Sequence, residues 1–371
     1  MKLLIEKNIL LESLTNVMRA ISPKNIIPIL NGVMFDLREE GLYLTASDSD
    51  LTIRNFIPKE KIKNIAIPGQ IVIQSKYLLE IIRKLPNGDI NIEVIDGLKI
   101  IISTDKTIYN LNCLDTADYP DINLEEVENP IVINSTTLKQ AINKTLFAVS
   151  TQESRPILTG INLKINGNVM ECVATDSYRL SKKTITLDNA YDSRDIVIPG
   201  KNINELDKLI TDESDVEIHV FNNKIVFKYM NYIFQSSLLS GSYPNTNNLI
   251  PTKFEFVITT SLNDYYNAID RAALLTQNKD KNIIKMETNN TELLISSYAS
   301  EIGKSEESIL INKSNEQDIS ISFSSKYMID ALKTFEDEEL IIFLNNDSSP
   351  IILKSAKDET LIQLILPIKT Y

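Results

Sequence analysis

The stretch ECVATDSYRLSKKTI, residues 171–185, is matched far upstream by LYLTASDSDLTIRNFI, residues 42–57. In each stretch an aspartate-centred turn, at Asp176 or Asp48, separates two runs in which apolar and polar residues alternate. Alternation with a period of two is typical of β-strands, so both stretches predict a hairpin. The interval from Asp48 to Asp176 is the length of an ordinary domain. A period of this length indicates repeated domains rather than short solenoid repeats.

Other segments recur at a similar spacing or at about twice that spacing. The matching pairs are DYPDINL (118–124) with SYPNTNNL (242–249), IPG (67–69) with IPG (198–200), and SKYLLEI (75–81) with SKYMIDA (325–331). The last pair is the one at about twice the spacing, which implies a third copy of the unit. Its turn segment is LLISSYASEIGK, residues 293–304, which lacks the aspartate. The 371 residues therefore predict three domains of equal size, at 1–124, 125–250 and 251–371.

Each unit combines short alternating runs with two segments whose apolar residues recur every three to four positions. The six predicted helices are residues 9–22, 75–85, 135–151, 200–212, 261–281 and 324–336. Strand-like runs such as GLYLTAS, GLKIIIS and EELIIFLNN fill the remainder. The class is therefore predicted to be α+β, with antiparallel sheets and two helices in each domain.

Composition indicates a globular protein of the reducing cytoplasm. Hydrophobic residues make up 43% of the chain and charged residues 24%, and no apolar run is long enough to span a membrane. Glu6 and Lys7 interrupt the N-terminal region where a signal peptide would be apolar. The two cysteines, Cys113 and Cys172, fall in different predicted domains, which argues against a disulfide framework.

Residue sets that carry out catalysis are scarce. The sequence contains no GxGxxG, GxxxxGK, HExxH or GxSxG motif. The single histidine, His219, lies in the alternating run VEIHVF and is expected to be a half-buried strand residue. Asp48 and Asp50 could form part of a metal loop, but the glycine and the distal glutamate of a calcium loop are missing, so an Asx-turn is the favoured interpretation.

Charge is distributed unevenly along the chain. The net charge is −12, which argues against a generic nucleic-acid-binding protein. The six helical segments nevertheless sum to +3, which leaves −15 on the rest. The helical cations include Arg19, Arg83, Lys84, Lys139, Lys144, Lys201, Lys208, Arg271, Lys279, Lys281 and Lys333, with Lys24 just beyond the first helix. A helix-lined positive surface backed by acidic sheets would hold a polyanion without reading its sequence.

Four segments carry a resemblance to a known family. They are IPIL (27–30), TDSYRL (175–180), GSYPNTNNLIP (241–251) and the terminal LPIKTY (366–371). Together with the three equal units, the whole chain resembles the β sliding clamp of bacterial DNA polymerase III. The resemblance implies a head-to-tail homodimer closed into a ring, with helices lining the hole. It also implies a non-enzymatic processivity factor, without cofactor or metal, that encircles duplex DNA and is opened by a clamp loader. Its implied partners are the polymerase III catalytic subunit, other polymerases and repair proteins.

The resemblance also assigns residues to three sites. The partner-peptide pocket is expected at Leu158, Thr175, Tyr178, Arg179, Leu180, Pro244, Leu249, Leu364, Leu366, Pro367 and Ile368. Either Tyr178 or Arg179 would hold a glutamine-like group at the rim. The resemblance places DNA contacts at Lys24, Gln152 and Arg155, and the helical cations Arg83, Lys84, Lys144 and Lys201 complete the predicted DNA-binding set. The dimer interface is expected to join Tyr109 and Leu111 to Leu274 and Leu275.

The sequence departs from the family pattern at a few positions. Asn248 stands where many members have arginine, Pro156 and Ile157 replace aromatic residues, and Lys369-Thr370-Tyr371 replaces a shorter ending. Two other classes of function remain open at this point. One is a hydrolase that uses Asp48 or Asp176, which would gather polar groups in one cleft of one domain. The other is a β-rich repeat scaffold that does not bind DNA, which would not need its cations on helices.

Overall fold

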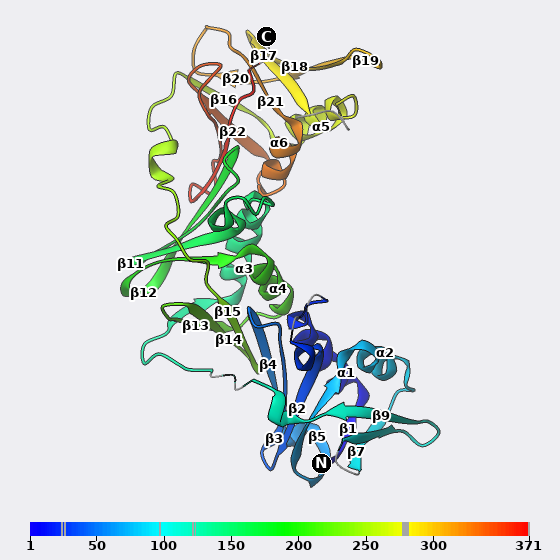
Figure 1. The fold of residues 1–371 in the computed structure, drawn as a ribbon. Helices are drawn as coiled ribbons and strands as arrows, with labels where there is room; N and C mark the ends of the chain where they lie inside the picture. The colour runs from blue at the N-terminus through cyan, green and yellow to red at the C-terminus, as the bar shows by residue number, and fades with distance from the viewer. Residues whose placement is uncertain are drawn as a thin grey trace. The chain divides into compact units, whose positions relative to one another are not determined.

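The computed structural model describes residues 1–23, 25, 27–95, 98–120, 122, 124–276 and 282–369. All six predicted helices are present in the described ranges (Figure 1). They are α1 (Lys7–Val17), α2 (Ser75–Lys84), α3 (Ser135–Thr145), α4 (Gly200–Leu209), α5 (Leu262–Ala273) and α6 (Ser325–Leu332). All six end earlier than predicted, and the apolar pattern after α1 and α3 continues through single 3-10 turns at Met18–Ala20 and Leu146–Ala148. None of the helices in the described ranges is long and apolar enough to cross a lipid bilayer.

The chain divides into two compact units. Unit 1 comprises Met1–Leu138 and Lys201–Leu238, and unit 2 comprises Lys139–Gly200 and Leu239–Tyr371. A 13-stranded sheet runs through unit 1 in the order β10-β13-β14-β15-β4-β3-β2-β6-β9-β8-β7-β1-β5. Its strands are β1 (Lys2–Glu6), β2 (Gly32–Arg38), β3 (Gly41–Ser47), β4 (Leu51–Pro58), β5 (Ile62–Ile67), β6 (Gly69–Gln74), β7 (Asp89–Ile95), β8 (Lys99–Ser103), β9 (Ile108–Leu114), β10 (Ile131–Asn134), β13 (Asp215–Val220), β14 (Lys224–Tyr229) and β15 (Tyr232–Ser237).

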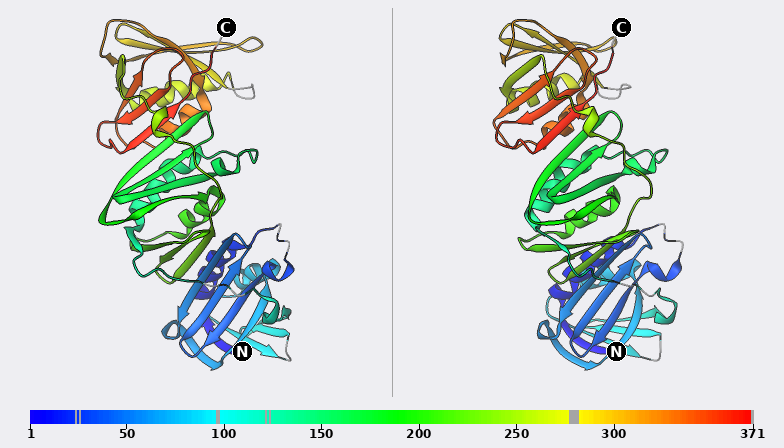
Figure 2. Two further views of the ribbon diagram at one scale, coloured as in Figure 1. Left: turned by 60° about the vertical axis from the view of Figure 1, so that its left-hand side comes forward. Right: turned by 90° about the vertical axis from the view of Figure 1, so that its left-hand side faces the viewer.

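Unit 2 contains two further sheets (Figure 2). One has seven strands in the order β11-β12-β24-β23-β22-β16-β20, and the other has four in the order β19-β18-β17-β21. The strands are β11 (Gly160–Thr175), β12 (Arg179–Pro199), β16 (Phe256–Ser261), β17 (Ile283–Asn289), β18 (Glu292–Ala299), β19 (Gly303–Leu310), β20 (Asn312–Lys313), β21 (Ser320–Ser324), β22 (Glu339–Leu344), β23 (Ile351–Ser355) and β24 (Leu361–Ile365). The strand pairs in the described ranges are antiparallel, so the α+β prediction is confirmed.

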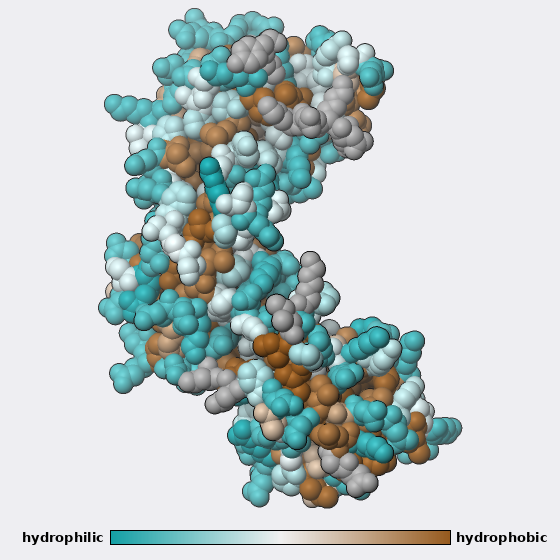
Figure 3. Space-filling model, in the orientation of Figure 1, coloured by the Kyte–Doolittle hydropathy of each residue, from teal (hydrophilic) through white to brown (hydrophobic). Residues whose placement is uncertain are grey.

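The helices cover the sheets with their apolar stripes. Leu10, Leu14 and Val17 of α1 are fully buried, as the spacing predicts, and α1 packs against α2, β3 and β4. In unit 2, α5 packs against α6 and against strands of both sheets, around a core that includes Ile269 and Met328. On the face drawn in Figure 3 the surface is mainly hydrophilic, and apolar side chains gather in separate patches.

The two aspartate turns are Asx-turns, as predicted. The Oδ1 atom of Asp48 accepts hydrogen bonds from the backbone N–H groups of Asp50 and Leu51, at 3.1 and 2.8 Å. Asp176 Oδ1 accepts from Tyr178 and Arg179 in the same way, at 2.9 and 3.0 Å. The intervening serines both have a φ of 78°. Both carboxylates therefore shape a hairpin, which removes the observation on which the hydrolase hypothesis rested. The third copy, between β18 and β19, is a hairpin without the aspartate.

A second repeat was missed in the sequence. PILNG at residues 28–32 and PILTG at residues 156–160 are separated by the same interval as Asp48 and Asp176, and each forms a 3-10 turn that leads into a strand. A Cβ on Gly160 would lie 2.5 Å from the carbonyl oxygen of Ile198, so a side chain cannot fit there. At Gly32 a Cβ would lie 2.5 Å from Val72 Cγ1. Close strand packing therefore requires glycine at both positions.

Strand pairing joins successive repeats in one consistent way. In unit 1, β15 pairs with β4, with Tyr232 opposite Asn55. In unit 2, β24 pairs with β12, with Leu361 opposite Lys183. Asn55 and Lys183 are equivalent positions, because the interval between them equals that between the two turn aspartates. The last strand of one repeat thus extends the sheet of the preceding repeat, and this continuity explains why residues 125–250 are divided between the two compact units.

Candidate functional site

The predicted peptide pocket is built on the start of β12, the end of β24 and the loop before Pro251. Leu180 and Leu364 are cross-strand neighbours, and with Val173 and Ile352 they form a buried apolar cluster. Tyr243, Ile250, Phe254, Phe343 and Ile362 pack against this cluster as partly buried side chains. Apolar pairs on adjacent strands are the usual means by which a sheet face is stabilised. The structure therefore brings together two of the five predicted leucines, Leu180 and Leu364.

The eleven predicted pocket residues differ in how far they are exposed. Buried residues are Leu158, Thr175, Arg179, Leu180 and Leu364. Exposed residues are Tyr178, Pro244, Leu249 and Leu366, and the apolar ones among them have exposed fractions of 58% for Tyr178, 48% for Leu249 and 38% for Leu366. Pro367 and Ile368 are intermediate. Exposed apolar side chains beside a buried apolar cluster are a surface suited to binding another chain.

Backbone hydrogen bonds hold the C-terminal segment after β24. The N–H of Leu366 donates to the carbonyl of Tyr178 at 2.9 Å, and the N–H of Ile368 donates to the carbonyl of Ser322 at 2.7 Å. Lys369 is exposed. Thr370 and Tyr371, two residues of the departing ending, lie outside the described residues. The segment is thus fixed along the predicted pocket through its backbone, which leaves the Leu366 side chain exposed.

The surroundings of Arg179 do not suit the role predicted for it at the rim of the pocket. Its side chain is only 10% exposed, and its guanidinium pairs with Asp176 at 3.0 Å and with Asp330 at 2.7 Å. It also lies over the rings of Phe147, 5.2 Å from the centroid, and Tyr327, 4.6 Å away. A guanidinium whose charge is already matched by two carboxylates and whose faces lie against two aromatic rings is poorly placed to hold a partner at the rim. Arg179 therefore connects the hairpin to α6, and the predicted rim role fits Tyr178 alone.

Tyr178 and Tyr243 are positioned by these neighbours. The Tyr178 ring stacks on Tyr327, with centroids 6.3 Å apart and planes inclined by 21°. The hydroxyl of Tyr243 accepts a hydrogen bond from the N–H of Thr175 at 3.0 Å. Burial raises the pKa of the Tyr243 phenol, so this side chain stays protonated at neutral pH. Both tyrosines therefore present defined surfaces beside the buried leucines.

Four of the predicted DNA contacts are exposed cations on helices or beside them. Arg83 and Lys84 occupy the last turn of α2, where Arg83 pairs with Glu80. Lys201 in the first turn of α4 is 62% exposed and lies 2.9 Å from Asp50. Arg155 donates to Ser177 Oγ at 3.3 Å. These are surface pairs of low energy, which phosphate groups could replace.

The remaining three residues of the DNA-binding set behave differently. Gln152 is exposed, and Lys24 lies outside the described residues. The structure does not favour the predicted DNA contact of Lys144. Its side chain is only 13% exposed, and its ammonium pairs with Asp358 at 3.4 Å and with Glu336 at 3.5 Å. An ammonium that is this little exposed and already paired with two carboxylates is poorly placed to reach DNA. Lys144 is therefore a structural cation of unit 2.

Asp358 forms the centre of a network that sequence reasoning missed. Lys183 Nζ lies 2.9 and 2.7 Å from its two carboxylate oxygens. Burial by itself would raise the Asp358 pKa, but hydrogen bonds from Lys183 and Thr360 and the charges of Lys183 and Lys144 outweigh it and lower the pKa to about 2. No local pattern marks this network, because 175 residues separate Lys183 from Asp358.

Asp358→Asn is expected to lower the free energy of unfolding at pH 7 by about 1–2 kcal/mol, a value reduced for solvent screening. A folded-state pKa below the ordinary value of 3.8 stabilises the protein above that pH. This stability is lost as the pH falls from about 4 to about 2, so the difference between variant and parent should shrink over that range. Denaturant titrations at several pH values measure it. Glu359→Gln, at the exposed neighbour, is the control, and a difference independent of pH would contradict the assignment.

The predicted interface residues lie in two places, on β9 and directly after α5. Tyr109 and Leu111 are half-buried on β9. Residues 108–112 of β9 pair with β8, and the pairing of β9 with β6 involves Cys113 and Leu114. Leu274 and Leu275 directly follow α5, and Leu274 is 62% exposed. Helix α5 packs against β19, the marginal strand of the four-stranded sheet.

The remaining sequence predictions concern His219 and the two cysteines. His219 is 1% exposed, so it is fully rather than half-buried. Its Nδ1 accepts from the N–H of Val127 at 3.0 Å, and desolvation lowers its pKa. Cys113 and Cys172 are free and buried, and burial raises their pKa values to about 11 and about 12. Thiols of this kind are unreactive at neutral pH.

Comparison with known proteins agrees with these observations. Models of the DNA polymerase III beta subunit match the chain with the N-terminal domain at residues 1–124, the central domain at 132–245 and the C-terminal domain at 247–369. The Beta sliding clamp of Bacillus subtilis (strain 168) is 40% identical, and that of Staphylococcus aureus is 37% identical, each over the whole of both chains.

Solved structures give the same result. The crystal structure of the DNA polymerase sliding clamp from Bacillus subtilis matches with a TM-score of 0.97 at 40% identity, over the whole of both chains. That of the DNA polymerase III beta chain from Streptococcus pneumoniae matches with a TM-score of 0.96 at 35% identity, also over both whole chains. The repeated hairpins, the paired helices and this full-length similarity together show that the chain belongs to the DNA polymerase III beta subunit family, the beta sliding clamps.

Proposed function

We propose that the chain is a sliding clamp: a non-catalytic, head-to-tail homodimer that encircles duplex DNA and tethers the replicative polymerase to it. Membership of the beta sliding clamp family supports this function. The observation that carries the assembly is the repeated strand pairing of β15 with β4 and of β24 with β12.

In both intrachain junctions the last strand of one repeat pairs with the second hairpin strand of the preceding repeat. One strand of each kind, β9 and β19, is left to pair with a second copy of the chain. Strand β9 ends the first repeat as β15 and β24 end the later ones, and β19 completes the third hairpin as β4 and β12 complete the first two. Among the described strands, β19 pairs with β18 alone. Pairing β9 of one copy with β19 of another would satisfy both edges and repeat the intrachain junctions. Two such pairings close a dimer.

Exposed apolar side chains on β9, at the end of β19 and after α5 support this interface. Ile108 on β9 is 67% exposed, Leu310 at the end of β19 is 77% exposed, and Leu274 after α5 is 62% exposed. Side chains this exposed are typical of surfaces that another subunit covers. Tyr109 and Leu111 on one copy, with Leu274 and Leu275 on the other, are therefore retained as proposed interface residues.

The clamp is proposed to hold DNA through distributed cations and to bind partners through the apolar site of unit 2. The DNA contacts are Lys24, Arg83, Lys84, Gln152, Arg155 and Lys201. The partners are the DNA polymerase III catalytic subunit, the clamp loader, and other polymerases and repair proteins that carry short polar-plus-aliphatic peptides. Leu249, Leu366 and Tyr178 would make the exposed contacts, over the floor formed by Leu180 and Leu364.

The domain boundaries proposed for the three repeats are 1–124, 125–250 and 251–371, and the proposed location is the cytoplasm. Native mass measurement combined with electron microscopy tests the assembly directly. A two-subunit ring is the expected result. An open filament or a stable monomer at micromolar concentration would contradict the proposal.

Leu274→Asp is expected to convert the dimer to a monomer, because the new carboxylate would be buried against apolar side chains without a compensating partner, which costs on the order of several kcal/mol. Size-exclusion chromatography with light scattering measures the mass. Leu249→Asp is the matched control, since Leu249 is 48% exposed but belongs to the proposed peptide site. That variant should remain dimeric. An unchanged dimer for Leu274→Asp would show that the interface lies elsewhere.

A further inference from the structure

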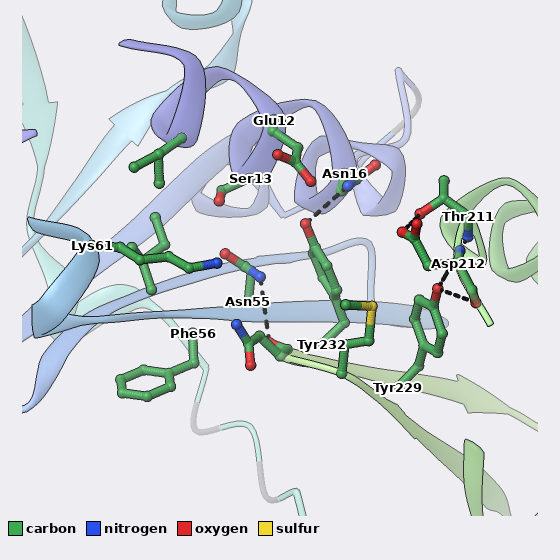
Figure 4. A pocket seen from close by; sticks show the side chains of 14 residues that line it. Glu12, Ser13, Asn16, Asn55, Phe56, Lys61, Thr211, Asp212, Tyr229 and Tyr232 are labelled. Atoms are coloured by element: carbon green, nitrogen blue, oxygen red, sulfur yellow. Dashed lines mark hydrogen bonds between the residues drawn. The ribbon is translucent and has the colours of Figure 1, made fainter. Parts of the chain in front are cut away.

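A cavity of about 120 Å³ opens in unit 1, between α1, β4 and the turn that joins β14 to β15 (Figure 4). Its wall contains Asn55 of β4 and Glu12 of α1, and Lys61, Asp212 and Met230 also line it. None of these residues belongs to the proposed DNA, peptide or dimer sites. The cavity therefore needs an explanation of its own.

Asn55 contributes a buried acceptor to the cavity. The residue is 3% exposed, and its Nδ2 donates to the carbonyl oxygen of Asn231 at 3.4 Å. This carbonyl fixes the orientation of the Asn55 amide. If Nδ2 and Oδ1 were exchanged, two acceptor oxygens would face each other. The Asn55 Oδ1 atom has no hydrogen-bond partner among the described residues. Buried acceptors without partners are rare, so an occupant of this cavity should be a hydrogen-bond donor.

Met230 contributes an apolar edge to the same cavity. Its side chain is 61% exposed, and its φ of 50° lies in the left-handed region that glycine and asparagine favour. The turn holds only Met230 and Asn231 between Tyr229 and Tyr232. Strained backbone is a reason to look for a function at the same place. An exposed methionine there can contact the aliphatic part of a ligand.

The charges around the opening select for a cation. Glu12 and Asp212 supply two carboxylates against the single ammonium of Lys61. Phosphate groups would be repelled, so DNA is not the expected occupant. An aliphatic stem that ends in a cationic N–H donor meets all three requirements.

In unit 2, the positions that correspond to this cavity in the repeat are occupied by the side chains of two lysines. Lys183 occupies the position of Asn55 in the repeat, and Lys144 follows Asn16 by the same interval and so occupies the position of Asn16. Their ammonium groups lie 2.7 and 3.4 Å from Asp358, and their side chains are 14% and 13% exposed. The repeat thus accommodates two alkylammonium groups here. In unit 1 both lysines are replaced by asparagines, and Asn16 donates instead to the hydroxyl of Tyr232 at 2.9 Å.

We propose that this cavity binds the side chain of a lysine presented by a partner protein. The methylene stem packs on Met230, the ammonium donates to Asn55 Oδ1, and Glu12 pairs with its charge. The site is separate from the proposed peptide pocket of unit 2, and its existence does not depend on ring closure or DNA loading.

The test uses the full-length protein labelled on its methionine methyl groups and followed by NMR. Of its seven methionines, Met230 is assigned by the loss of its signal in Met230→Leu. The probe is Nα-acetyl-lysine methylamide, which carries the side chain without a free α-amine. A saturable shift of the Met230 signal is expected. 1-Butanol, with a similar stem but no charge, and butyrate, with the opposite charge, should give no saturable shift.

Four variants make the test specific. Asn55→Lys should abolish binding, because it supplies an internal ammonium as Lys183 does in unit 2. Glu12→Gln should weaken binding by about threefold or more, and Lys61→Ala should strengthen it by a similar factor, as expected for partly exposed charge pairs. Glu80→Gln, on the exposed face of α2, is the matched control and should have no effect. If Asn55→Lys fails to fold, the two exposed substitutions at Glu12 and Lys61 decide the outcome.

Three results from these titrations and variants would overturn the proposal. They are an unsaturable Met230 shift, equal binding of 1-butanol, and an unchanged affinity in Glu12→Gln. A further titration with 1,4-diaminobutane tests whether the bound ammonium comes from a free diamine or from a lysine side chain. If the diamine binds tenfold more tightly than the lysine probe, the site takes free diamines, and the assignment to a protein side chain is wrong.

Discussion

On a nicked circular plasmid the loaded clamp is expected to remain bound through gel filtration at high salt, whereas linearising the plasmid should release nearly all of it. The physical reason is that a closed ring is retained by topology, while its direct contacts are weak. Exposed cations such as Arg83 and Lys201 already pair with neighbouring carboxylates, and the net charge of −12 opposes DNA binding elsewhere on the surface. The measurement is the fraction of protein that elutes with the DNA.

Linear DNA with bulky proteins fixed at both ends is the matched control, and it should retain the clamp as the circle does. Equal retention on open linear and circular DNA would contradict encirclement. A footprint confined to particular sequences would contradict it as well, because the proposed contacts reach phosphates rather than bases.

Removing residues 366–371 is expected to abolish the binding of partner peptides while the dimer stays folded. The deletion begins after β24, which ends at the fully buried Ile365, so the seven-stranded sheet remains intact. It removes the exposed Leu366 together with Pro367 and Ile368. Each lost aliphatic contact is worth about 1.5–3 kcal/mol, which corresponds to roughly a tenfold to hundredfold loss of affinity. Fluorescence anisotropy with a labelled polymerase tail peptide measures the dissociation constant.

A shorter deletion, of residues 369–371, is the control for this prediction. It retains the hydrogen bonds from the backbone of Leu366 to Tyr178 and from Ile368 to Ser322, so peptide binding should persist. Undiminished binding by the folded longer truncation would show that the pocket has been placed wrongly. Loss of binding in both would assign the contact to the last three residues instead.

The sequence by itself predicted what depends on local pattern and on repetition. Apolar spacing predicted all six helices and their buried stripes, because Leu10, Leu14 and Val17 fall on one face at the period of an α-helix. The aspartate turns were predictable because a short carboxylate can accept from the N–H groups two and three residues ahead. Repetition at a domain-length interval then predicted the three domains, and the resemblance of the terminal LPIKTY and other segments predicted the family.

Only the tertiary structure decided which charged residues are available for binding. Arg179 and Lys144 look like free cations in the sequence, but their partners Asp330 and Asp358 are 151 and 214 residues away. Such pairs leave no periodic trace, since they depend on how separate elements pack rather than on the spacing within one element. The unpartnered Asn55 and the exposed Met230 were equally hidden, because burial and a positive φ are properties of the folded chain. Contacts between residues distant in sequence therefore decided which side chains are paired and which are free to bind, and so how equivalent positions of the repeats differ.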